Sequence, residues 1–170
     1  VQYADCLEKM EGHRPVIFYT NGFDTFIWDD TFYQERKIHG FFTKDQLQLL
    51  IDRRSTRKKI SGFRVNESIT ERYYQKMAIQ RVAEAFEKVE KNGSIKSNGR
   101  KALLVMATGS GKTRTAASIV DMLTKCNWAK RVLFLADRNA LVSQAQNAFK
   151  EHLPNLTSID LTKEKEEAST

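Results

Sequence analysis

The residues with the most definite chemistry lie in one short segment, residues 108–113, which reads T-G-S-G-K-T. An apolar run of buried-strand length, residues 102–107, precedes it, and a stretch with helical spacing follows. Glycines let the backbone curl so that several N–H groups point at one anion, and a helix N-terminus adds its dipole. In such a loop Lys112 reaches the β- and γ-phosphates, and the Thr113 hydroxyl ligates Mg²⁺. The segment predicts a site for a nucleoside triphosphate and Mg²⁺, formed by Thr108, Gly109, Ser110, Gly111, Lys112 and Thr113.

This loop departs from the pattern G-x-x-x-x-G-K-[ST] at its first position, where Met106 replaces the glycine. The alternative is a Gly-Ser turn that only happens to precede Lys-Thr. A strand-like run before the loop and a helix-like stretch after it favour the phosphate-binding interpretation.

Two β-rich runs near the N-terminus are joined by Asn21-Gly22, after residues 1–10, which resemble the end of a helix. Asn-Gly favours positive φ at both turn positions, so we predict a β-hairpin over about residues 16–28. Asp29-Asp30 follows it, and a solvated turn is favoured there over a metal-binding pair.

A helix and a basic run come next. Thr43 and Gln46 form a capping-box pattern that starts a helix through Leu47. The basic run spans residues 53–59, and a solvated linker is favoured there over a dedicated DNA contact.

From residue 68 onward, helical and strand-like patterns alternate. Residues 68–71 offer a second capping box, before a helix that we expect to stop near Lys91. Residues 102–107 and 132–136 resemble buried strands, each followed by a helix, and residues 158–161 resemble a third strand. Such alternation predicts an α/β fold in which helices cover a parallel sheet.

Bulk composition limits the class of protein. The 170 residues leave room for one ordinary domain or for pieces of two, and the formal charge of +7 favours a polyanionic partner, nucleic acid first. Cys6 and Cys126 are far apart and have no metal-like spacing, which predicts a reduced, cytoplasmic protein. No apolar run approaches the ~18 residues that span a bilayer, so we expect no membrane partner.

Three segments together resemble motifs of superfamily 2 helicases and translocases. The segment T-E-R-Y-Y-Q resembles the Q-type motif, and M-A-T-G-S-G-K-T resembles motif I. The segment V-L-F-L-A-D-R-N-A-L-V-S-Q resembles motif Ia. The resemblance implies a RecA-like lobe that binds ATP and Mg²⁺. It implies that Gln75 reads the adenine edge, since one amide donates and accepts at once, and that Arg72 or Tyr73 packs against the base. Without the neighbouring motifs, Gln75 would be an exposed helix glutamine.

Motif Ia of that superfamily contacts the backbone of nucleic acid. By resemblance the contacting residues are Asp137, Arg138, Asn139, Ser143 and Gln144. Arg138 is the expected phosphate contact, and a solvated arginine after a strand is the alternative.

Two N-terminal segments resemble the end of the nuclease domain in the R subunit of Type I restriction enzymes. They read Y-A-D-C-L-E and R-P-V-I-F-Y-T-N-G-F-D-T-F-I-W-D-D. This resemblance implies three parts. Residues 1–42 would be a helix and β-hairpin that end a nuclease-type α/β domain, residues 43–67 a basic linker, and residues 68–170 the first part of a RecA-like lobe. It also implies an internal fragment of a longer polypeptide, because no D-E-x-H acid pair follows motif Ia and no nuclease E-x-K stands before the hairpin.

The implied parent protein is an ATP-dependent DNA translocase and endonuclease that works on double-stranded DNA together with methylation and specificity subunits. The isolated fragment is expected to be inactive. Other interpretations stay open: another superfamily 2 motor, such as a Type III restriction subunit or an RNA helicase, a P-loop kinase, or a non-catalytic interaction module.

Overall fold

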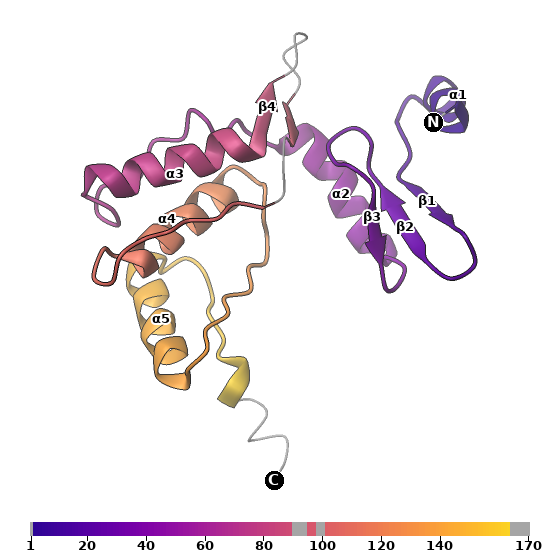
Figure 1. Ribbon diagram of the computed structural model, residues 1–170. Helices are drawn as coiled ribbons and strands as arrows, with labels where there is room; N and C mark the ends of the chain where they lie inside the picture. Colours follow the sequence, from indigo (N-terminus) through magenta and orange to yellow (C-terminus); the bar gives the residue numbers. More distant parts are fainter. Residues whose placement is uncertain (1, 90–94, 98–100, 164–170) are drawn as a thin grey trace. The chain divides into compact units, whose positions relative to one another are not determined.

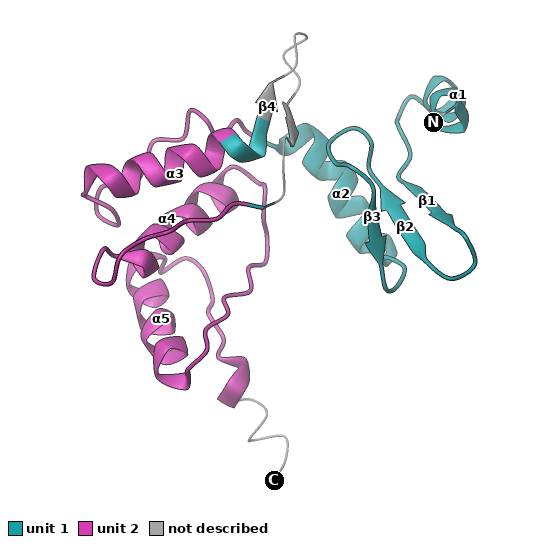
Figure 2. Cartoon of the chain, in the orientation of Figure 1, with its two compact units in different colours: residues 1–57, 85–101 teal, residues 58–84, 102–170 magenta. Residues whose placement is uncertain are grey.

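The computed structural model of the chain describes residues 2–89, 95–97 and 101–163 (Figure 1). The chain forms two compact units (Figure 2). Unit 1 contains residues 1–57 and 85–101, and unit 2 contains residues 58–84 and 102–170. The division between Arg57 and Lys58 falls inside the segment predicted as a linker, residues 43–67.

Unit 1 begins with helix α1 (Gln2–Glu11) and a three-stranded antiparallel sheet of β1 (Ile17–Thr20), β2 (Thr25–Trp28) and β3 (Arg36–Ile38). The predicted hairpin is confirmed, because β1 pairs with β2. Its loop is longer than a two-residue turn. Gly22 has a φ of 94°, and the Asn21 side-chain oxygen accepts the N–H groups of Phe23 at 3.1 Å and Asp24 at 2.8 Å. The asparagine thus stabilises the loop through its side chain.

Helix α2 (Lys44–Thr56) has the predicted capping box at its start. The Thr43 hydroxyl accepts the Gln46 N–H at 3.3 Å, and the Gln46 side-chain oxygen accepts the Thr43 N–H at 3.0 Å. Two N–H groups that the helix cannot pair internally are therefore satisfied.

Two arginines of the basic run, Arg54 and Arg57, are not solvated, contrary to the sequence-based expectation, whereas Lys58 and Lys59 are exposed. Arg54 donates to the Asp29 carboxylate at 2.9 Å and to the carbonyl of Arg14. Arg57 is buried, with its guanidinium 5.0 Å from the Phe32 ring centre and 4.8 Å from that of Tyr33. These arginines join α2 to the segments around the sheet, so they stabilise unit 1.

The Asp29-Asp30 pair is also not a solvated turn. Asp29 is buried against Arg54, and Asp30 accepts a hydrogen bond of 2.6 Å from the Arg14 guanidinium. Arg14 also donates to Asp5 and Glu8 of α1, at 2.7 Å each. Three carboxylates thus surround one arginine.

The Arg14 hydrogen bond lowers the pKa of Asp30 below its ordinary value. A carboxylate with a depressed folded-state pKa contributes stability above its unfolded pKa of about 3.9, and this contribution is lost as the pH falls through the folded pKa. Asp30→Asn should therefore lower the melting temperature at pH 7. Below about pH 4, the melting temperature of the variant should fall less steeply with pH than that of the wild type. Thermal unfolding between pH 3 and pH 7 measures both effects.

Asp24→Asn is the matched control. Asp24 forms an exposed ion pair with Lys37 at 2.6 Å, and exposed pairs contribute little to stability. Equal stability losses for the two variants would contradict the role given to Asp30.

Unit 2 contains α3 (Tyr73–Phe86, whose last two residues belong to unit 1), α4 (Lys112–Lys125) and α5 (Asn139–His152). Ala117 and Val120 of α4 form a buried cluster with Ile69 and with Leu153, which follows α5, and Phe149 of α5 packs against this cluster. Ile79, Val82 and Ala83 of α3 are also buried. A buried hydrogen bond of 3.1 Å joins the hydroxyls of Thr70 and Ser118. The helical spacing seen in the sequence is therefore confirmed for α4 and α5.

Helix α3 differs from its prediction at both ends. Its capping box was expected at residues 68–71, but the Asn66 side chain accepts the backbone N–H and the hydroxyl of Ser68, and the helix begins at Tyr73. It ends at Phe86, because residues 87–89 form β4 (Glu87–Val89), which pairs antiparallel with β5 (Ile95–Ser97). The composition of residues 92–94 and 97–99 predicts loops. Of these residues only Ser97 is among the described ones, and it is the last residue of β5.

The predicted parallel sheet is not formed in the described part of unit 2. Residues 102–107, 132–136 and 158–160 have no strand pairing, and Leu161, the last residue of the third predicted strand, is helical (Figure 1). Leu103, Val105, Leu133 and Leu135 are 87%, 90%, 67% and 80% exposed. A strand needs a neighbour for its N–H and C=O groups, and an apolar run alone does not supply one. The observed fold is a set of helices with small antiparallel sheets, consistent with part of an α/β lobe.

Among the described residues, every helix is too short or too polar to cross a membrane.

Candidate phosphate-binding site

The predicted loop lies directly before α4. Gly109 and Gly111 have φ angles of 75° and 84°, a region that side-chain-bearing residues seldom adopt. The Ser110 N–H and hydroxyl both donate to the carbonyl of Ala107, at 3.3 and 2.6 Å, which closes a tight turn. Gly111 is the N-cap of α4 and offers no side chain to pair with the N–H groups of the first helical turn. The loop thus combines a tight backbone curve with a helix N-terminus, as an anion site requires.

Lys112 is exposed and bends back over the loop. Its ammonium donates to the carbonyls of Met106 at 3.1 Å and Ala107 at 3.4 Å. Thr113 lies in the first turn of α4 and is half-buried. The Thr115 hydroxyl and N–H both donate to the carbonyl of Gly111, at 3.2 and 3.0 Å, which fixes the start of the helix.

Gln75 is brought to the loop, although 35 residues separate it from Ser110. It is only 3% exposed, and its side-chain amide donates to the Ser110 carbonyl at 2.9 Å. A Cβ added to Gly111 would lie 2.3 Å from this amide nitrogen. The alternative of an exposed helix glutamine is therefore wrong, and Gln75 contacts the backbone of the loop itself.

Tyr74 also contacts the candidate loop, although the sequence interpretation did not single it out. Its hydroxyl donates to the same Ser110 carbonyl at 3.1 Å and accepts a hydrogen bond of 2.7 Å from the Arg72 guanidinium. This hydrogen bond with Tyr74 raises the pKa of Arg72 above its ordinary value. Tyr74 recurs at helical spacing with Ala78 and Val82, so the sequence pattern places it among the apolar positions of the helix. The one signal available was its place beside Gln75, since a half-buried tyrosine needs a partner for its hydroxyl.

Arg72 and Tyr73 are both exposed at the start of α3. The Tyr73 ring lies edge-on to that of Tyr74, with 5.7 Å between ring centres. Both side chains therefore lie next to residues that contact the loop.

The motif Ia residues gather at the start of α5. Arg138 is the N-cap of this helix, and its carbonyl accepts the N–H groups of Leu141 at 3.0 Å and Val142 at 3.1 Å. Its side chain is exposed and lies 3.8 Å from the Asp137 carboxylate. Asn139 and Gln144 are exposed and Ser143 is half-buried. The described contacts do not join this group to the candidate loop at residues 108–113.

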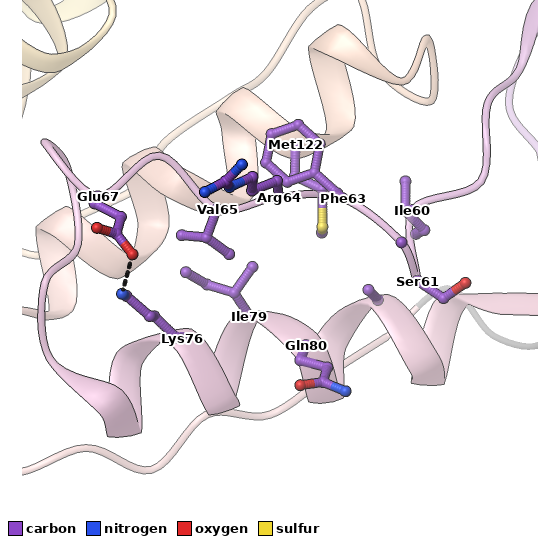
Figure 3. A pocket seen from close by; sticks show the side chains of 12 residues that line it. Ile60, Ser61, Phe63, Arg64, Val65, Glu67, Lys76, Ile79, Gln80 and Met122 are labelled. Atoms are coloured by element: carbon purple, nitrogen blue, oxygen red, sulfur yellow. Dashed lines mark hydrogen bonds and ion pairs between the residues drawn. The ribbon is translucent and has the colours of Figure 1, made fainter.

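A separate hollow of about 340 Å³ lies between α3 and residues 60–67 (Figure 3). Its wall includes the apolar side chains of Phe63, Ile79 and Met122. The ion pair between Glu67 and Lys76, at 2.7 Å, lies beside it, and the Lys76 hydrogen bond lowers the pKa of Glu67. Its described lining includes none of the sequence-predicted site residues.

Comparison with known proteins gives a family and two relatives. Residues 68–170 match the family described as Type III restriction enzyme, res subunit. The chain is 51% identical over 77 residues to the Type I restriction enzyme EcoAI endonuclease subunit of Escherichia coli, which is 45% of this chain and 8% of that protein. It is 41% identical over 80 residues to the Type I restriction enzyme EcoKI endonuclease subunit of Escherichia coli strain K12, which is 47% of this chain and 6% of that protein. No solved structure matches.

The matched stretches span less than a tenth of the length of either relative. The resemblance to the R subunit of Type I restriction enzymes is confirmed by these two relatives. Because the family match covers more than half of the 170 residues, the chain belongs to the family of the Type III restriction enzyme res subunit.

Proposed function

We propose that this chain is part of the motor subunit of a Type I restriction enzyme and binds ATP with Mg²⁺ through residues 108–113. One observation carries the proposal: a Gly-Ser-Gly turn with two positive φ angles starts α4, in a chain of this family. Lys112 would hold the β- and γ-phosphates, and Thr113 would supply a hydroxyl ligand to Mg²⁺. In phosphoryl transfer such groups act by positioning the phosphates and neutralising charge, with little covalent chemistry.

We further propose that the start of α5 binds the backbone of double-stranded DNA. Arg138 is exposed there beside a helix N-terminus, and both features favour phosphate. Hydrolysis of ATP would then drive DNA past the enzyme, and a linked nuclease would cut it. Methylation and specificity subunits are the proposed partners, because both relatives are endonuclease subunits of Type I enzymes.

The test uses the full-length polypeptide with duplex DNA, Mg²⁺ and its partner subunits. ATP hydrolysis and DNA cleavage are followed together, with EDTA added in a parallel sample. We expect both activities, and we expect EDTA to remove both. A protein that cuts DNA equally well without ATP would contradict the motor assignment.

Adenine recognition by Gln75 is the finer part of this proposal. Gln75→Ala should weaken ATP and GTP binding alike through the lost contact with Ser110, and should weaken ATP further if the amide also reads adenine. Competition binding with the two nucleotides separates these effects. An equal loss for both nucleotides would restrict Gln75 to supporting the loop.

A further inference from the structure

The carbonyl of Ser110 receives two side-chain hydrogen bonds from the start of α3, one from Gln75 at 2.9 Å and one from Tyr74 at 3.1 Å. A carbonyl oxygen has two lone pairs, so both donors can be accommodated. Two donors from one helix on a single loop carbonyl fix the direction of that carbonyl.

The direction of the Ser110 carbonyl also determines where an N–H group of the loop points. The carbonyl of Ser110 and the N–H of Gly111 belong to one peptide unit, and the described chain has no cis peptide bond. In a planar trans unit these two groups point in opposite directions. With its carbonyl held toward α3, this unit directs the Gly111 N–H away from α3.

The other side of Gly111 is fixed as well. The Gly111 carbonyl accepts the N–H and the hydroxyl of Thr115 in the first turn of α4, at 3.0 and 3.2 Å. The Gly111 backbone is therefore held from α3 on one side and from α4 on the other. Glycine is needed at this point, because its φ is 84°.

Arg72 fixes the direction of the Tyr74 hydroxyl. A guanidinium has only donors, so in the 2.7 Å contact the phenol oxygen must accept. Its own hydrogen is then available for the Ser110 carbonyl. A cation bound to the phenol oxygen polarises the O–H bond, which strengthens it as a donor.

We propose that Tyr74 is a positioning residue for phosphate binding: its hydroxyl, oriented by Arg72, holds the Ser110–Gly111 peptide so that the Gly111 N–H points into the anion site. This inference rests on the proposed function of the loop. Tyr74 acts through the peptide and does not itself contact the base. Its contribution is therefore the same for any nucleoside triphosphate.

The experiment compares Tyr74→Phe with wild type in the full-length protein, using ATP and GTP as probes. One uncharged hydrogen bond is lost, so KM should rise roughly three- to tenfold, by the same factor for both nucleotides. The melting temperature without nucleotide should stay near that of wild type, because the ring is retained. Tyr19→Phe is the matched control: its hydroxyl bonds to Glu35 in unit 1, and KM should not change.

A merely structural role gives a different result. Partial unfolding removes active molecules, so kcat would fall while the KM of the remaining molecules stayed constant. An unchanged KM, or a KM that rises for ATP alone, would overturn the proposal. If Tyr74→Phe does not fold, Tyr74→Leu removes the same hydroxyl with a smaller side chain, and the same KM comparison applies.

The Lys112→Ala variant keeps this inference separate from the proposed function. If Lys112→Ala hydrolyses ATP normally, the loop is not the ATP site and the proposed function fails. If Lys112→Ala is inactive while Tyr74→Phe has wild-type KM values, the proposed function stands and only the role of Tyr74 is rejected.

Discussion

Lys112→Ala is expected to abolish ATP hydrolysis by the full-length protein, with a loss of at least about a hundredfold. In the structure the Lys112 ammonium already lies over the loop, 3.1 Å from the carbonyl of Met106 and 3.4 Å from that of Ala107. Phosphate oxygens bound in the loop would replace these weak partners by charge-assisted hydrogen bonds, which contribute roughly 1.5–3 kcal/mol each. Negative charge also shifts among the phosphate oxygens during transfer, so the lysine acts on rate as well as on binding.

Two further variants sharpen this experiment. Lys150→Ala removes the same charge from an exposed position near the end of α5 and should leave hydrolysis unchanged. Lys112→Arg keeps the charge but replaces a compact ammonium by a planar guanidinium, so it should restore part of the binding and little of the rate. Phosphate release and nucleotide binding are measured separately. Normal phosphate release in Lys112→Ala would rule out this loop as the ATP site.

The local parts of the fold could be predicted because their causes are local. Asn21-Gly22 contains what a hairpin loop needs, and the Thr43 and Gln46 pair is a complete capping box within four residues. The apolar spacing of α4 and α5 reports which helix face packs into the core. Each of these elements depends on residues that are neighbours in the sequence.

Long-range contacts could not be predicted in this way. Arg54 pairs with Asp29 across 25 residues, and no local pattern distinguishes such an arginine from a solvated one. The runs at residues 102–107 and 132–136 have the composition of strands, but a strand also depends on which segment lies beside it. The composition of a segment indicates that it favours burial, but it does not identify the segment that would pair with it.

The same limit applies to the candidate site. The glycine loop and Lys112 form a contiguous motif, so the sequence places them together. Gln75 was identified only through its resemblance to the Q-type motif, and its contact with Ser110 appears in the structure alone. Tyr74 was not identified, because helical periodicity treats its ring as apolar and says nothing about its hydroxyl. Side chains that act on the backbone of a distant loop are thus the hardest to find.

Gly111→Ala should reduce ATP binding much more than Gly109→Ala, although both substitutions replace a loop glycine. Both positions have a positive φ, 84° and 75°, so either alanine pays a similar backbone cost of roughly 1–2 kcal/mol. Their surroundings differ. A Cβ at Gly109 would meet nothing within 4 Å, whereas a Cβ at Gly111 would lie 2.3 Å from the buried amide nitrogen of Gln75.

The collision forces Gln75 to leave the Ser110 carbonyl, so Gly111→Ala should lose that hydrogen bond in addition to the backbone cost. We expect its dissociation constant for ATP to exceed that of Gly109→Ala by about tenfold, as one further hydrogen bond predicts. The double variant Gly111→Ala with Gln75→Ala removes the obstructing amide, and its loss should be smaller than the sum of the two single losses. Titration with ATP measures all four proteins. Strictly additive losses would mean that residue 111 does not displace Gln75, and that backbone strain alone explains why this position holds glycine.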